Sequence, residues 1–277
     1  MKRSLSGVFA ALLITSNAYA ADLMPAEPIA APEVTVTEAT GWYLRGDVGY
    51  GFNDLRGAKY FQGSNASEVD FDRSDLDDAW TIGGGVGYQV NNYFRTDLTL
   101  DYLGKSDFHG STSGSCGVSG ACTSTDLSSL TAWSLMANAY VDLGTYGYVT
   151  PYVGAGIGGT YVKWKDLNNT SCDSSGSGLG CDPTFIHGGK GGWRFSYGLM
   201  AGASIDVTCN VKADVGYRFL HVNGGDMFGY NEGGGPGRDK GFNVHEARVG
   251  ARYLFGGCQT ASYEPAPEIP LQQPVYK

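Results

Sequence analysis

The sequence predicts an all-β fold: an eight-stranded antiparallel up-and-down transmembrane β-barrel with long extracellular loops and short periplasmic turns. Three observations support this prediction. Eight segments alternate apolar with polar or charged residues, the joins between them alternate short with long, and aromatic residues gather at the segment ends. Successive side chains of a strand point to opposite faces, so each segment has one apolar and one charged face. The 43 glycines also disfavour helices and suit strands joined by turns.

The chain begins with the pattern of a secretory signal peptide. Lys2 and Arg3 precede a short apolar stretch, and Ala18-Tyr19-Ala20 is typical of a signal peptidase site. We predict a signal peptide over 1–20, a Pro-rich periplasmic linker over 21–40, the barrel over 41–255 and a Pro-rich periplasmic tail over 256–277. Removing Lys2 and Arg3 takes the formal net charge from −9 to −11, which argues against nucleic acid as a partner.

The joins between the predicted strands alternate in length. The strands are expected at 41–52, 79–90, 93–103, 130–143, 149–162, 193–207, 211–220 and 242–255. Three joins are short turns, at 91–92, 144–148 and 208–210, and four are long and rich in Gly, Ser, Asn and Asp, near 53–78, 104–129, 163–192 and 221–241. Short turns on one side and long loops on the other are typical of outer-membrane barrels, whose short turns are periplasmic. The even strand number then places both termini in the periplasm.

Sorting each strand by parity separates an apolar face from a charged one. The charged face carries seven cations and seven anions: Arg45, Asp47, Arg95, Asp97, Asp101, Asp142, Arg194, Asp206, Lys212, Asp214, Arg218, Glu246, Arg248 and Arg252. A soluble barrel would bury all of these charges in a pocket or expose its large aromatics to water. We therefore predict that the apolar face contacts lipid and that the charges form a paired network filling the lumen. The alternative is an open pore.

Aromatic residues mark the two ends of the apolar face. Six of them are predicted to form membrane girdles at the lipid–water boundaries: Trp42, Trp80, Trp133, Trp193, Tyr253 and Phe255. Packing inside a core would not explain why they group at the strand ends.

Six cysteines allow fifteen pairings, and the barrel topology reduces the choice. Cys116 and Cys122 share one long loop, and Cys172 and Cys181 share the next. Cys209 lies in a short turn and Cys258 just after the last strand, on neighbouring strands. We predict the disulfides Cys116–Cys122, Cys172–Cys181 and Cys209–Cys258, formed in an oxidising compartment.

The residues offer no pattern for catalysis. There is no serine-nucleophile motif, and no histidine lies on the inward parity of a predicted strand. His109, His187 and His221 lie in or beside long loops without metal-site spacing. We predict no catalytic residue, no metal site and no cofactor.

Several strand motifs resemble a known family. GWYLRGDVGYGF, LMANAYVDLG with TPYVGAGIGGTYV, VGYRFL and VHEARVGARYLF are similar to the alphaproteobacterial outer-membrane β-barrel proteins, small porin-like or OmpA-like barrels that include surface antigens and hemin-binding members. The resemblance covers roughly 41–255 and implies a structural, porin-like or adhesive protein without shared catalytic residues. One departure is that Phe255, the terminal aromatic, is followed by 22 further residues.

The expected function is that of a structural, surface-exposed outer-membrane protein, which contributes to envelope integrity and to surface interactions through its loops. The alternatives are a narrow porin-like channel for ions or small solutes, and an adhesin or heme-binding surface protein. Expected partners are outer-membrane lipid and lipopolysaccharide, the barrel-assembly machinery, and a host or surface ligand bound through the loops. The first loop, 53–78, has seven carboxylates and either binds divalent cations or stays solvated; we favour solvation.

Overall fold

The computed structural model describes residues 40–62, 67–232 and 234–257, which belong to one compact unit, Val36–Thr260. The predicted signal peptide, nearly all of the predicted linker and tail, and Cys258 lie outside the described residues. In the part of the chain that is described, no helix is long and apolar enough to cross a membrane.

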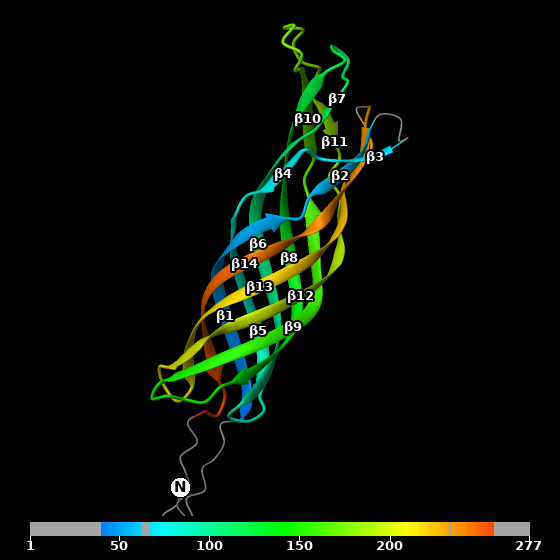
Figure 1. Ribbon diagram of the computed structural model, residues 1–277. Helices are drawn as coiled ribbons and strands as arrows, with labels where there is room; N and C mark the ends of the chain where they lie inside the picture. The colour runs from blue at the N-terminus through cyan, green and yellow to red at the C-terminus, as the bar shows by residue number, and fades with distance from the viewer. Residues whose placement is uncertain (1–39, 63–66, 233, 258–277) are drawn as a thin grey trace, which may run out of the picture. The chain divides into compact units, whose positions relative to one another are not determined.

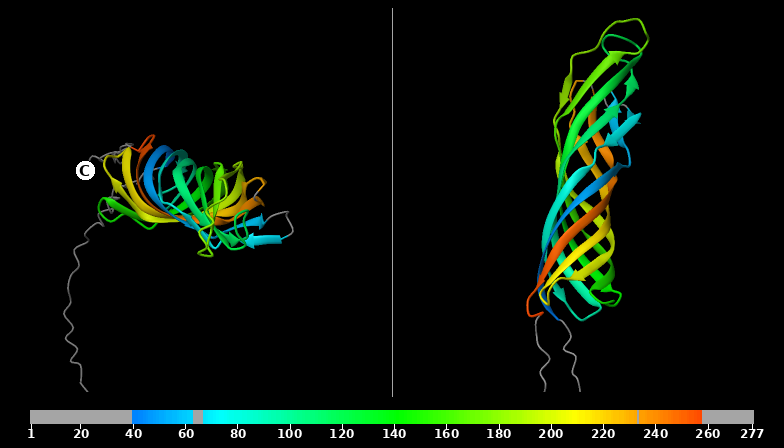
Figure 2. Two further views of the ribbon diagram at one scale, coloured as in Figure 1. Left: turned by 90° about the horizontal axis from the view of Figure 1, so that it is seen from above. Right: turned by 90° about the vertical axis from the view of Figure 1, so that its left-hand side faces the viewer.

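Eight antiparallel strands close into a ring, as the alternation predicts (Figure 1). They are β1 (Gly41–Leu55), β5 (Ala79–Gln89), β6 (Phe94–Ser111), β8 (Cys122–Asp142), β9 (Val149–Trp164), β12 (Gly191–Asp206), β13 (Val211–Phe228) and β14 (Gly234–Leu254). The order around the ring follows the chain, and pairing of β1 with β14 closes it. Figure 2 shows the ring strands winding obliquely around the barrel, as closure requires. The predicted fold class is therefore confirmed.

The two ends of the barrel differ in their connections. Three short turns, at 90–93, 143–148 and 207–210, join ring strands at one end, where β1 also starts and β14 stops. We call this the turn end and the opposite end the loop end.

The long joins are less irregular than the sequence suggests. They contain β2 (Ala58–Gln62), β3 (Ser67–Asp70), β4 (Arg73–Leu76), β7 (Ser113–Gly114), β10 (Leu167–Asp173) and β11 (Phe185–His187). Of these, β2 pairs with β14, β4 with β6, and β7 and β10 with β8. The expected long join between the last two strands is mostly strand, because β13 and β14 run on to leave only 229–233 between them. The alternation of apolar and polar residues is weak in the strands of the long joins, because their outer face is polar as well.

Burial confirms the parity that separates lipid from lumen. Along β8, residues alternate between buried and exposed from Trp133 to Asp142. The exposed positions are the apolar ones, including Leu135 and Val141, and the buried ones include Asn138 and Asp142. The same holds on β12, where Phe195, Leu199 and Ile205 are exposed. Such a surface is stable only in hydrocarbon.

The interior consists of two layers. Charged and polar side chains fill the barrel toward the turn end, whereas apolar side chains fill it toward the loop end. This apolar plug comprises Leu55, Ala58, Phe71, Leu76, Ala79, Leu103, Phe108, Leu130, Ala132, Met136, Val162, Trp164, Leu167, Leu220, Val222, Met227, Phe228, Phe242 and Val244. This plug is an addition to the network of charges that the sequence predicts for the lumen.

Candidate functional site

The charged layer is built around Arg45, which reaches across the lumen from β1. Its guanidinium donates to both carboxylate oxygens of Asp47, at 2.9 and 2.7 Å, and through Nη1 to Asp97 Oδ2 at 2.8 Å. Tyr43 and Asn138 also donate to Asp97, at 3.1 and 2.8 Å. Three strands (β1, β6 and β8) are therefore linked through one carboxylate in the lumen.

A second group links β6, β13 and β14. Asp101 accepts from Arg218 and Arg248, each at 2.7 Å, and Glu246 accepts from Arg218 at 2.6 Å and from Thr81. Asp101 and Glu246 are almost fully buried. Buried charges are tolerated only when paired, and each charge of this group has an ion-pair partner, although Arg248 Nε is buried without a hydrogen-bond acceptor.

The turn-end part of the network is held by Arg95 and Arg252. The Arg95 guanidinium lies between the rings of Tyr140 and Tyr152, 4.2 and 4.5 Å from their centroids, and donates to Asp142 at 3.1 Å. Arg252 donates to Asp214 at 2.7 and 3.1 Å. The Lys212–Asp206 pair, 2.7 Å apart, closes this layer at the mouth and is partly exposed.

The structure brings all fourteen predicted lumen charges to the inward face. All but Arg194 form ion pairs with one another. Arg194 lies closer to the loop end and pairs at 2.7 Å with Asp239. Asp239 is not among the lumen charges that the sequence predicts. Trp164 donates its indole N–H to the same carboxylate at 3.1 Å. Extending the predicted strand 149–162 by two residues would have placed Trp164 inward.

Glycines in the wall make room for the network. A Cβ added to Gly83 on β5 would collide with the Asp101 carboxylate, and one added to Gly250 on β14 would collide with Asp47. By contrast, Gly46 faces outward and has no heavy atom within 4 Å of an added Cβ. The lumen side of the wall therefore requires glycine where the outer side only tolerates it.

The lumen is filled. The internal cavity beside Arg45, Tyr152 and Arg248 has about 10 Å³ of space, and the cavity between Asp101 and Phe242 also has about 10 Å³. Each has room for about one water molecule. A larger space of about 90 Å³ lies at the turn-end mouth, near Asp142 and Lys212. An eight-stranded barrel has an interior that side chains can fill, and here they do.

The predicted girdle residues all point away from the lumen and are exposed: Trp42, Trp80, Trp133, Trp193, Tyr253 and Phe255. Toward the loop end, Trp80 packs on Tyr102 and Tyr102 on Trp133, with ring centroids 5.6 and 4.8 Å apart. Trp193 packs on Tyr161 at 5.6 Å. Toward the turn end, Trp42 packs on Tyr88 at 5.3 Å. Two aromatic bands bound the lipid-facing surface between them.

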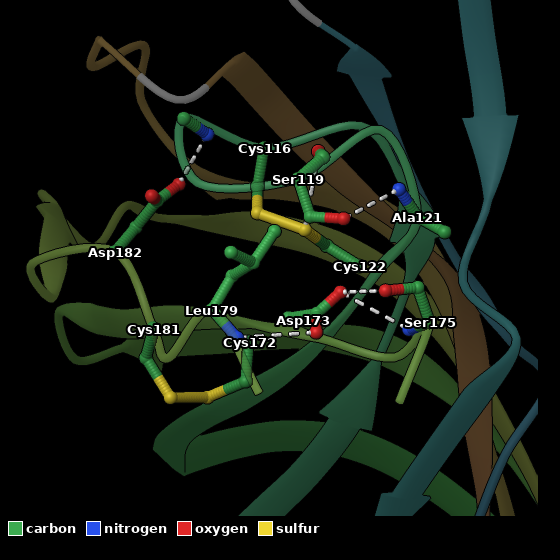
Figure 3. Close-up of a disulfide and its surroundings, with 11 residues drawn as sticks. Cys116, Ser119, Ala121, Cys122, Cys172, Asp173, Ser175, Leu179, Cys181 and Asp182 are labelled. Carbon is green, nitrogen blue, oxygen red and sulfur yellow. Dashed lines mark hydrogen bonds between the residues drawn. A yellow bond between two sulfur atoms is a disulfide. The ribbon is translucent and has the colours of Figure 1, made fainter. Parts of the chain in front are cut away.

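Two disulfides clamp the tip of the loop end (Figure 3). Cys116–Cys122 and Cys172–Cys181 have the pairing that the sequence predicts. The two loops are tied to each other, because the Gly117 backbone N–H donates to Asp182 at 2.8 Å and the Ser174 N–H donates to the Ala121 carbonyl at 2.9 Å. The third predicted pair, Cys209–Cys258, stays a prediction because Cys258 lies outside the described residues.

A small polar pocket lies beneath this tip, above the apolar plug. Asp126 accepts from Ser124 at 2.5 Å and from Asn169 at 2.6 Å, and His187 lies across the pocket with Nδ1 3.2 Å from the Gly229 carbonyl oxygen. Burial raises the pKa of the Asp126 carboxyl and lowers the pKa of the His187 imidazole. Both effects favour neutral side chains in this cap of the barrel.

Comparison with known proteins identifies a family. The family described as "Outer membrane protein beta-barrel domain" matches this chain over residues 8–255. An uncharacterized protein of Brucella abortus (strain 2308) is 39% identical over 279 residues, covering 88% of this chain and 95% of that protein. A Rickettsia bellii (strain OSU 85-389) protein named "Putative adhesin" is 27% identical over 222 residues, covering 76% of this chain and 87% of that protein.

Among solved structures, the crystal structure of Neisserial surface protein A is similar, with a TM-score of 0.42 and 16% identity. It covers 78% of this chain and 97% of its own.

Proposed function

The chain belongs to the outer membrane protein β-barrel family, and on that premise we propose that it is a non-enzymatic structural barrel that displays a rigid extracellular extension for surface interactions. The protein is located in the outer membrane of a Gram-negative bacterium. The observation that supports this proposal best is the division of the interior into a paired charge network and an apolar plug. The barrel is then a support for its loop end, which faces the outside.

The filled lumen disfavours the channel alternative. An ion crossing the barrel would have to pass both the network and the plug, where Phe108, Leu130 and Val222 are fully buried. The interior cavities of about 10 Å³ leave no room for a hydrated solute. Conduction would therefore require the strands or the plug to rearrange.

The loop end has the features of a binding platform. β8 and β10 continue as a paired sheet beyond the barrel, and the disulfides fix the connections at their tip. Fixed loops lose little conformational entropy on binding. An adhesive role is the second candidate, favoured by this rigid tip and by the Rickettsia relative named "Putative adhesin". The residues of the tip are mainly Ser, Gly and Asp, and this composition does not favour heme binding.

Nothing in the network favours an enzyme. The inward carboxylates Asp97, Asp101 and Glu246 are buried, and each accepts hydrogen bonds from at least two side chains. A general acid or base needs access to substrate, and these groups are sealed in the wall.

Trimming the tip tests the proposal. We expect removal of residues 171–182 to leave the β10–β11 pairing at Asn169 and Phe185 in place, since the deletion starts beyond it and takes both Cys172 and Cys181. Attachment of expressing cells to host surfaces should fall to background while the heat-modifiable gel shift of the folded barrel persists. A control variant carries a Gly/Ser segment of equal length at 171–182. Unchanged attachment by both variants would contradict a role for the tip in binding.

A further inference from the structure

The turns at the turn end of the barrel carry no full charge. The three turns at 90–93, 143–148 and 207–210 consist of Val, Leu, Asn, Thr, Tyr, Gly and Cys, without Asp, Glu, Lys, Arg or His. The joins at the loop end differ, since the 53–78 join alone has seven carboxylates. A partner of the loop end can be held by ion pairs, whereas a partner of the turns is held through neutral groups alone.

Three tyrosines on these turns are strongly exposed. The exposed fractions of the Tyr93, Tyr146 and Tyr148 side chains are 63, 72 and 76%. Tyr146 and Tyr148 are more exposed than any other large apolar side chain in the described part of the chain. Both come after Leu143, the last outward apolar residue on the β8 side of their turn, so they lie beyond the lipid-facing surface. The turn-end girdle already anchors the barrel in the membrane, which leaves these rings available for another contact.

The two turns that carry the tyrosines lie side by side and are held by hydrogen bonds. The Asp142 N–H donates to the Tyr93 carbonyl at 2.8 Å, which joins the first turn to the end of β8. The Asp206 N–H donates to the Tyr148 carbonyl at 2.8 Å, which joins the second turn to the end of β12. The three tyrosines therefore lie on one arc of the rim. Because the backbone of this arc is fixed, binding to it costs little conformational entropy.

A polar hollow of about 90 Å³ lies beside this arc, at the mouth of the lumen. Asn92 and Thr145 line it from the two turns that carry the tyrosines, and Gln89, Asp142 and Lys212 line it from the strands. These groups include both donors and acceptors of hydrogen bonds. The hollow has room for a small polar substituent of a ligand in place of a few water molecules.

Exposed aromatic rings beside a polar hollow suit a neutral carbohydrate. The C–H face of a sugar ring packs on an aromatic ring, and tyrosine offers a rigid ring with a polar tip. An acetamido substituent has one N–H donor and one carbonyl acceptor, and the hollow has partners for both. A phosphate-bearing partner would meet no cation on the turns themselves.

We propose that the turn-end rim, defined as the turns 90–93 and 143–148 with the hollow beside them, binds chains of N-acetylated amino sugars, the chemistry of the glycan in the cell wall. The inference rests on the proposed function, because it requires the turn end to face the periplasm. Two turns of four and six residues form a small contact, whereas a stable protein–protein interface takes about 20–30 residues a side. Many barrels that face one polymer convert such weak contacts into firm attachment.

Co-sedimentation of the folded protein in detergent with purified, protein-free cell-wall sacculi tests the proposal. The variant Tyr146→Ser/Tyr148→Ser removes two rings from the rim. The matched control, Leu179→Ser/Tyr230→Ser, removes two apolar side chains of the loop end that are 56 and 60% exposed. One aromatic contact contributes a factor of about 2 to 12 in affinity, so we expect the rim variant to bind about tenfold more weakly or worse.

Two further comparisons separate ring packing from other effects. The variant Tyr146→Phe/Tyr148→Phe keeps both rings and should bind as the wild type and the loop-end control do. A soluble oligomer of N-acetylglucosamine should compete with the sacculi, whereas a glucose oligomer of the same linkage lacks the acetamido group and should compete less. The heat-modifiable gel shift establishes that each variant is folded before it is used.

Several results would overturn the proposal. If the wild-type protein did not sediment with sacculi, the tyrosines would be anchors in the lipid headgroups instead. Equal weakening by the rim variant and the loop-end control would remove the role of the rim. Sedimentation that the N-acetylglucosamine oligomer left unchanged would assign binding to the peptides of the wall, and equal competition by the two oligomers would contradict the role of the hollow. Binding to sacculi is measured on purified protein, whereas attachment through the tip at 171–182 is measured on cells, so the two proposals fail separately.

Discussion

The charged layer and the apolar plug fill the same barrel by different physical means. In the charged layer, Asp101 holds two guanidinium groups and stability depends on the pairing of buried charges. In the plug, Phe108 and Trp164 pack with ring centroids 5.7 Å apart, and stability depends on volume. Losing one partner of a buried pair leaves a charge in the wall, whereas losing a methylene leaves only a small void. The two halves of the lumen should therefore respond very differently to single substitutions.

The largest effect is expected in the charged layer. Asp101→Ala leaves Arg218 and Arg248 without their shared acceptor, and we expect a loss of about 3–5 kcal/mol in the free energy of unfolding. Urea titration of the heat-modifiable gel shift measures it. The control, Asp107→Ala, removes an acceptor from an exposed pair with Lys105 and should cost no more than about 1 kcal/mol. Similar losses in the two variants would contradict the dependence on buried pairing.

A Gly→Ala substitution should reduce stability on the lumen side of the barrel wall but not on its outer side. Gly83→Ala introduces a Cβ that collides with the Asp101 carboxylate, and we expect it to cost about 1–3 kcal/mol of unfolding free energy. Gly46→Ala, on the neighbouring strand β1 with its added Cβ pointing outward, meets no atom within 4 Å and should be neutral or slightly stabilising. The same urea titration compares them. A neutral Gly83→Ala would mean that the network can move aside.

The plug should tolerate a conservative change better. Phe108→Leu removes part of a ring that packs on Phe71 and Trp164, and we expect a loss of about 1–2 kcal/mol. Phe195→Leu, on the lipid-facing side, is the matched control and should change stability little. If Phe108→Leu proved as damaging as Asp101→Ala, the contrast between the two layers would not hold.

The smallest effect concerns pH at the cap. Burial lowers the pKa of His187 below its ordinary value of 6.5, so the opened segment binds a proton more readily than the packed one. Closure of β11 is therefore fully favoured above pH 6.5 and weakens as pH falls below it. The raised pKa of Asp126 acts in the opposite direction at more acidic pH. Hydrogen exchange at 185–187 should be faster at pH 5.5 than at 7.5, after correction for intrinsic rates.

Substitution of the histidine checks the cause of this effect. His187→Gln should remove the pH dependence of exchange at β11, whereas His109→Gln, which changes an exposed histidine, should leave it intact. A pH dependence that survived His187→Gln would assign it to another group.

Segments that alternate apolar and polar residues could be predicted from the sequence, whereas strands and interior residues without this alternation could not. The eight ring strands, the lipid-facing side and the inward position of residues such as Arg45 and Glu246 follow from period-2 parity, because the membrane imposes it on one face. Beyond the girdle that constraint ends, so the strand extensions bearing Asp126 and Asp239 have the composition of loops and the sequence predicts loops there. The plug does not follow from parity, because parity separates inward from outward residues and does not separate charged from apolar ones. Its inward apolar residues, such as Leu130 and Val162, stand on the same parity as the charges.

Single-molecule conductance tests the central claim, that the lumen is closed by both layers. Folded wild-type protein in a planar bilayer should show no discrete conductance steps, because beyond the turn-end mouth the network and the plug fill the lumen around two cavities of about 10 Å³ each. Reproducible unitary steps from protein free of other porins would contradict the claim, and the channel would then replace the structural barrel as the function of this protein.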